Sequence, residues 1–224
     1  MADSVWRRLQ WPTTTRGHLL VGAIAPDAHR VAQDLGFRKS HFRLRRQAGM
    51  RPRDLLIEYV RPALIIGSPD EQAFWLGWLT HVSSDALWRR TLRDHLPGLW
   101  HGCTRGERER RRLLRSQYRD ACDTVDREIA ESEPALMDEL RWLLRTNHRP
   151  YDVFPLTPQQ LEEWIIALLS DYLPPPEPET RGNDVIYRAF VKHVMDAAVE
   201  ESLVLIYTEL DRAAEEKGTS GELT

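Results

Sequence analysis

The sequence predicts an all-α protein, a single-domain helical bundle. Along most of the chain, apolar residues recur at three- and four-residue spacings, which is the period of an amphipathic helix. No segment alternates apolar and polar residues over the length of a β-strand. Proline, serine and threonine stand where the periodic segments begin and end, as they do at helix termini. The 224 residues, 42% of them hydrophobic, are enough for one core of ordinary size.

The first half of the chain contains three apolar segments. Residues 17–25 form the first, and Pro26 ends it because proline lacks an N–H and clashes with the preceding turn. Residues 53–60 form a short amphipathic stretch. The third segment predicts a longer helix over residues 70–95, with Ser68 at its start.

Four more helices are expected in the second half. Residues 105–129 read as a long, highly charged helix, and residues 133–147 as a shorter one. The next begins after Thr157, a good N-cap that is followed by proline at the first helical position, and covers residues 158–173. The last helix is expected over residues 183–217.

A proline-rich stretch, "LPPPEPETRGND" at residues 173–184, is the clearest break in the chain. It is typical of a domain linker or of a stiff connection. One helix beyond it is too little for a second core, so we expect the last helix to pack back on the bundle. Residues 1–224 then form one domain.

Composition and charge narrow the class of protein. A net charge of −3 argues against broad nucleic-acid binding, which needs a basic excess. The two cysteines, Cys103 and Cys122, form no Cys-x-x-Cys motif and suit a reducing compartment. The chain begins without the apolar stretch of a signal peptide and has no run of about 20 apolar residues. We expect a cytoplasmic protein without a transmembrane segment.

Two ionisable residues, His81 and Asp85, interrupt an apolar segment of the helix at 70–95. At positions i and i+4 they share one helix face, so their side chains can meet. A hydrogen bond from the imidazole to the carboxylate is the simplest explanation for this pair alone. The alternative is that both bind a metal ion, since buried charges are paired or coordinate metals.

Three further residues of the same types precede this pair: His18, Asp27 and His41. Imidazole nitrogen and carboxylate oxygen together suit zinc, with manganese, iron and nickel as alternatives. The five residues together therefore favour a metal site over an isolated hydrogen bond.

Residues 17–90 carry a resemblance to a known family. The segments "GHL…GAIAPDAHR", "SHF" and "WLGWLTHVSSDALWR" are similar to the bacterial zinc-dependent phospholipase C family, above all to its shorter cytoplasmic members. The resemblance implies an all-helical bundle of the phospholipase C and P1 nuclease type, with metal ions at one end that serve to hydrolyse phosphodiesters of phospholipids.

The ligand order of that family is an Asp, a later His, and then a His-x-x-x-Asp helix. By this resemblance Asp27, His41, His81 and Asp85 hold one zinc ion. An earlier family histidine, which shares the last Asp through a second ion, corresponds to His18.

The chain departs from the family at its remaining ligands. The secreted members use an N-terminal tryptophan, whereas this chain begins MADSVW. They also carry a later His-x-x-x-Glu pair, but the nearest candidate, His193, is followed by Ala197 at that spacing. We therefore expect one or two zinc ions rather than three.

The leading hypothesis is a metal-dependent hydrolase of phosphoric esters that acts on a small phosphoester or a phospholipid-like substrate. Zinc would acidify a bound water for attack on phosphorus. Asp27, or an acid behind the ligands, would take the proton. Arg89, Arg90 or an arginine of residues 105–119 would offset the phosphate charge.

Two other hypotheses stay open. The first is a non-catalytic protein that keeps a structural metal site and acts through partner binding. The second has no metal, and the histidines and aspartates form a hydrogen-bonded core network. Residues 104–120, the most basic stretch, suit either an anionic ligand or a solvated helix face. Trp75 and Trp78 are most simply core or groove-wall residues.

Overall fold

The computed structural model describes residues 1–32, 60–95, 109, 112, 116, 122, 124–146, 156–172 and 185–221. Within these residues the regular secondary structure is helical throughout, and no β-strand is present. The prediction of an all-α fold is confirmed. The predicted connection at 173–184 and the ligand candidate His41 lie outside the described residues.

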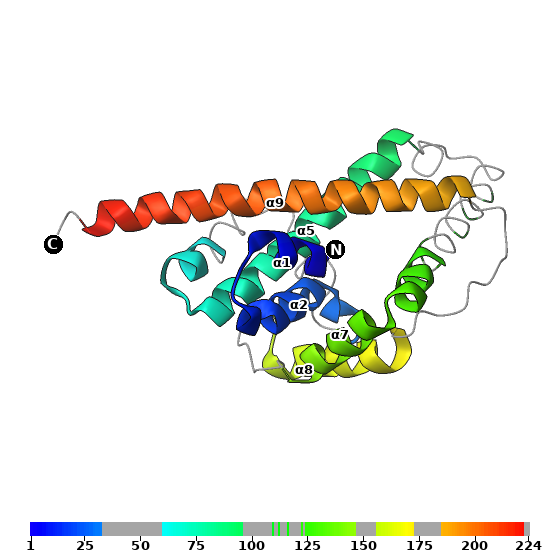
Figure 1. Ribbon diagram of the computed structural model, residues 1–224, viewed down its shortest axis with the longest axis horizontal. Helices are drawn as coiled ribbons and strands as arrows, with labels where there is room; N and C mark the ends of the chain where they lie inside the picture. The colour runs from blue at the N-terminus through cyan, green and yellow to red at the C-terminus, as the bar shows by residue number, and fades with distance from the viewer. Residues whose placement is uncertain are drawn as a thin grey trace.

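Figure 1 shows the helices, coloured in chain order from α1 near the N-terminus to the long α9 near the C-terminus. Six α-helices of the described residues are α1 (Ala2–Leu9), α2 (Arg16–Ile24), α5 (Pro69–His95), α7 (Pro134–Thr146), α8 (Pro158–Ala167) and α9 (Val185–Gly221). Shorter turns are η1 (Thr13–Thr15) and η2 (Ala25–Arg30), both 3₁₀, and the π-helical turn η5 (Leu168–Tyr172). Residues 60–66 and 124–132 are also helical.

Helix termini agree with the capping residues read from the sequence. Thr157 caps α8 through a capping box, in which its side chain accepts from the Gln160 N–H and Gln160 bonds back to the Thr157 N–H. Ser68 accepts from the Glu71 N–H at the start of α5, at 3.3 Å. The predicted starts of these two helices are therefore confirmed.

Helix α1 was not predicted from the sequence. Its eight residues bury only Val5 and Leu9, a pair one turn apart that gives little periodic signal. Arg16 fixes α1 to the rest of the protein, because its Nε donates to the Asp3 carboxylate at 2.7 Å and its guanidinium lies 5.1 Å from the centre of the Trp6 ring. This ion pair is nearly buried, so α1 is held by charge as well as by apolar packing.

Helices α2 and α5 pack with their backbones in close contact at two glycines. A Cβ atom added to Gly22 would lie 1.9 Å from the carbonyl oxygen of Phe74. One added to Gly77 would lie 1.9 Å from the carbonyl oxygen of Leu19. Only glycine fits at either position, and the close approach brings the end of α2 against the middle of α5.

The aromatic residues of α5 form part of the core. Phe74 and Trp78 have no exposed surface, and Trp75 is 4% exposed. The rings of Phe74 and Trp75 meet edge to face with centroids 5.8 Å apart, a favourable arrangement. The interpretation of Trp75 and Trp78 as core residues is confirmed.

In Figure 1 the long helix α9 crosses α5, and α1 and α2 lie between α9 on one side and α7 and α8 on the other. With 37 residues, α9 is about 55 Å long. It packs on α5, where the Ser83 and Ser202 hydroxyls share a buried hydrogen bond of 2.8 Å and Arg90 pairs with Glu201 at 2.7 Å. The last helix therefore packs on α5.

No helix in the described part of the chain is both long and apolar enough to cross a membrane.

Candidate metal centre

Asp27 is placed by the way α2 ends. Pro26 cannot continue an α-helix, and after Ile24 the chain tightens into η2, with Asp27 in its first turn. The last carbonyl groups of α2 then need partners from elsewhere, since an α-helix leaves its final carbonyls without intrahelical donors. Side chains of α5 and α8 supply two of those partners.

His81 of α5 supplies the first. Its Nδ1 lies 2.8 Å from the carbonyl oxygen of Ala23. Because a carbonyl oxygen only accepts, Nδ1 must carry the proton of this bond. In the neutral ring, Nε2 is then the atom with a lone pair, and it points to Asp27, with 4.0 Å between Nε2 and the Asp27 Oδ1.

The separation between His81 and Asp27 is too long for a direct hydrogen bond. Ligands of a tetrahedral zinc ion lie about 3.3–3.6 Å apart. The pair would have to close by roughly half an ångström to share such an ion, so its donor types suit a metal but its spacing is wider than zinc requires.

His29 lies close to the same carboxylate but presents a different atom. Its Nδ1 is 3.9 Å from the Asp27 Oδ1 and donates to the carbonyl of Pro26 at 3.0 Å. The nitrogen that faces Asp27 therefore carries a proton in the neutral ring. His29 orients this end of η2 but does not offer a lone pair toward the His81 side.

Arg30 contacts Asp27, and Trp164 lies close to Arg30; neither residue was singled out in the sequence. The Arg30 Nη2 lies 3.5 Å from the Asp27 Oδ2, on the opposite carboxylate oxygen from His81. Trp164 of α8 donates its indole N–H to the carbonyl of Ile24 at 2.8 Å, the second carbonyl at the end of α2. Its ring lies 6.0 Å from the Arg30 guanidinium.

The structure does not bring His18 to Asp85. The His18 Nε2 lies 3.4 Å from the Oδ2 of Asp70, in the first turn of α5. Asp70 and Asp85 are 15 residues apart on this helix, about 22 Å along its axis. The second metal implied by the resemblance, shared between His18 and Asp85, does not match this arrangement. His18 is 3% exposed and is explained as a buried histidine with a carboxylate partner.

Asp85 lies one turn beyond His81 on α5, and its carboxylate forms an ion pair with Arg89 on the following turn. The hydrogen bond expected from the His81 imidazole to Asp85 is replaced at Nδ1 by the bond to Ala23. For Asp85 to join a metal at His81, its carboxylate would have to exchange Arg89 for the ion. Arg89 and Arg90, two of the residues expected to meet phosphate, pair with Asp85 and Glu201.

Of the five predicted ligands, the structure therefore brings together Asp27 and His81, with Asp85 beside them. His41 lies outside the described residues. Within the described ranges, no group of three or more histidine, cysteine, aspartate or glutamate side chains is spaced to hold a metal ion. Any metal site centred on Asp27 and His81 therefore needs at least one further ligand to move in or to come from elsewhere in the chain.

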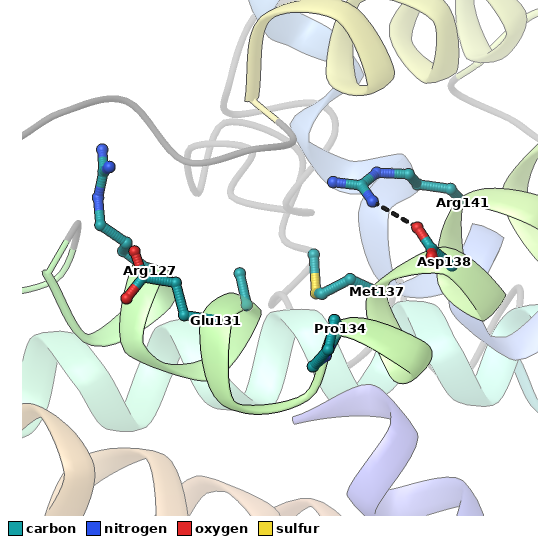
Figure 2. A pocket seen from close by; sticks show the side chains of 7 residues that line it. Arg127, Glu131, Pro134, Met137, Asp138 and Arg141 are labelled. Atoms are coloured by element: carbon teal, nitrogen blue, oxygen red, sulfur yellow. Dashed lines mark hydrogen bonds and ion pairs between the residues drawn. The ribbon is translucent and has the colours of Figure 1, made fainter.

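A surface cavity lies apart from these residues, where the helix at 124–132 meets α7 (Figure 2). It is lined by Arg127, Ala130, Glu131, Pro134, Met137, Asp138 and Arg141. Its volume of about 260 Å³ is below the roughly 300–1,000 Å³ of most small-molecule sites. No histidine lines it, and Arg141 pairs with Asp138 at 2.8 Å, so nothing in this cavity suggests a metal or a reaction.

Comparisons with protein family models, with curated proteins and with solved structures find no match to this chain.

Proposed function

We propose that this protein is a metal-dependent hydrolase of phosphoric esters, built on a helical bundle of the phospholipase C and P1 nuclease type. The observation that supports this most is the facing of the His81 Nε2 and the Asp27 Oδ1 across 4.0 Å. Their donor chemistry suits zinc, and the bond from His81 to a backbone carbonyl is the kind of support that orients metal-binding histidines.

In the proposed centre, Asp27 and His81 hold the ion, and Asp85 and His41 are the further ligands that the family resemblance implies. A zinc ion bound there would lower the pKa of a water molecule and polarise a phosphoryl oxygen. The carbonyl of Ala23 keeps the His81 proton on Nδ1, which makes Nε2 the ring nitrogen that would bind the ion. Asp27 is the carboxylate closest to this nitrogen, and we assign it to accept the proton of the attacking water.

Hydrolysis of phosphodiesters by the zinc-loaded protein tests this function. Bis(4-nitrophenyl) phosphate and phosphatidylcholine vesicles cover a small ester and a lipid. We expect turnover by the natural protein and a loss of at least about a hundredfold in Asp27→Asn, as for loss of a general base. His193→Ala, which alters an exposed histidine of α9, is the matched control and should retain full activity.

If the natural protein binds zinc in stoichiometric amount and hydrolyses neither substrate, the hydrolase proposal fails and a structural metal site remains. Equal activity in Asp27→Asn and the natural protein would show that any hydrolysis arises elsewhere.

A further inference from the structure

Arg30 and Trp164 form a charged platform next to the Asp27 carboxylate. Arg30 lies on η2, three residues after Asp27, whereas Trp164 comes from α8, far away in the sequence. The guanidinium lies 6.0 Å from the indole centre, within the range of a cation–π interaction. Helix α8 therefore contributes a side chain to the candidate metal centre although it holds none of the predicted ligands.

The indole is a fixed support. Trp164 is 2% exposed, and its N–H is held by the carbonyl of Ile24 at 2.8 Å. An arginine that lies over a fixed ring loses less freedom when it binds a planar anion, because its own plane is already restricted. The arginine side chain itself is about half exposed, at 48%.

The Asp27 carboxylate separates the two sides of the site. Its Oδ1 faces His81, while its Oδ2 faces Arg30 at 3.5 Å. A permanent positive charge thus lies on the side of the Asp27 carboxylate opposite His81, and it is more exposed than either Asp27 or His81. A guanidinium pairs with two oxygens of a phosphate at once, which is the geometry that a phosphoric ester offers.

We propose that Arg30 binds the phosphate group of the substrate and that Trp164 positions its guanidinium. The proposal rests on the proposed function, since it takes the Asp27 and His81 pair as the reaction centre. It takes the place of Arg89 and Arg90 as the phosphate contact, because Arg30 pairs with Asp27 of the proposed centre itself, whereas Arg89 and Arg90 pair with Asp85 and Glu201.

Calorimetric titration of the zinc-loaded protein with inorganic phosphate tests the assignment. We expect Arg30→Gln to weaken phosphate binding by about ten- to a hundredfold, the usual effect of losing a hydrogen bond to a charged group. Arg30→Lys keeps the charge but loses the planar fork, so it should restore part of the affinity. Arg90→Gln alters an arginine of similar exposure on α5 and should bind phosphate like the natural protein.

Zinc affinity, measured on the same variants, separates this role from a structural one. It should stay equal or rise in Arg30→Gln, since the guanidinium lies 3.5 Å from the Asp27 Oδ2 and its loss removes a charge that competes with the ion for that carboxylate. In hydrolysis assays the weaker phosphate binding of Arg30→Gln should appear mainly as a higher KM. Loss of zinc together with phosphate would mean that Arg30 acts only by holding Asp27, which would overturn the proposal.

Other outcomes are equally decisive. Unchanged phosphate affinity in Arg30→Gln, or zinc binding by the natural protein without phosphate binding, would overturn the assignment and leave the metal centre intact. If the natural protein binds no zinc, the proposed function fails. Titration of the metal-free protein then decides the role of Arg30, since phosphate binding that Arg30→Gln removes supports it and absence of binding overturns it.

Discussion

The chemistry of His81 is set by a backbone carbonyl rather than by another side chain. The Ala23 carbonyl can only accept, so it holds the imidazole proton on Nδ1 and leaves the lone pair on Nε2. Pro26 contributes indirectly, because it ends α2 and so leaves terminal carbonyls for other groups to use. Asp27 then stands opposite Nε2 at 4.0 Å. These few residues define the centre.

Arg89 competes with a metal for the Asp85 carboxylate, if Asp85 is a ligand as the resemblance implies. In the structure the two side chains form an ion pair across one helical turn. We expect Arg89→Gln to tighten zinc binding by roughly threefold to tenfold, because this partly exposed ion pair, which contributes on the order of 1 kcal/mol, no longer has to be broken. Competition with a chromophoric chelator measures this affinity.

Arg90→Gln is the control for that measurement, since Arg90 pairs with Glu201 on α9. A zinc affinity in Arg89→Gln that equals or falls below the natural value would remove Asp85 from the ligand set.

At the scale of helices, the close contact of α2 and α5 is what brings Ala23 to His81. Gly77→Ala would normally stabilise a helix by about 1 kcal/mol. Here the added methyl group meets the Leu19 carbonyl at 1.9 Å, and both are backbone atoms that cannot move independently. We expect the free energy of unfolding to fall by about 3 kcal/mol, at the upper end of overpacking effects, as measured by urea denaturation.

Ala86→Gly offers the matched comparison, because Ala86 lies exposed on the same helix. It should cost only about 1 kcal/mol. A neutral or stabilising Gly77→Ala would contradict the close backbone approach of the two helices.

Periodicity and caps predicted most described elements well, since α2, α5, α7, α8 and α9 lie within a few residues of the expected ranges. These signals are local. The neighbour of His81 was harder to predict, because it is a backbone carbonyl 58 residues away and carries no side-chain signature. The carboxylate partner of His18 could not be predicted either, because several acidic residues were candidates. Asp70 is the partner because α2 packs on the first turn of α5.

At the scale of the whole molecule, a pH-dependent ion pair connects the helix at 124–132 to α9. Glu128 accepts hydrogen bonds from Lys192 at 2.9 Å and Arg188 at 2.8 Å. These bonds, with Lys192 first, lower the pKa of the Glu128 carboxyl below its ordinary value of 4.5. Because the pKa of Glu128 is lower in the folded protein than in the unfolded chain, the contact stabilises the protein fully at a pH above the unfolded-state pKa. This stabilisation is lost as the pH falls through the folded-state pKa.

Glu128→Gln should therefore lower the free energy of unfolding by about 0.5 kcal/mol at neutral pH, since the partners are well exposed and screened by solvent. The difference from the natural protein should stay constant down to about pH 5 and vanish in stronger acid. Urea denaturation across this range measures it. A difference that grows as the pH falls would contradict the assignment of the contact to an ionised Glu128.

The central claim is that Asp27 and His81 bind a divalent metal ion, and zinc stoichiometry tests it most directly. His81→Asn is the sharpest variant, because the asparagine amide can still donate to the Ala23 carbonyl but has no atom in place of Nε2. After reconstitution and dialysis, elemental analysis should find at least one zinc per chain in the natural protein and in His193→Ala. His81→Asn should fold normally and lose that ion. A natural protein that retains no zinc, or a folded His81→Asn that keeps the full amount, would contradict the claim.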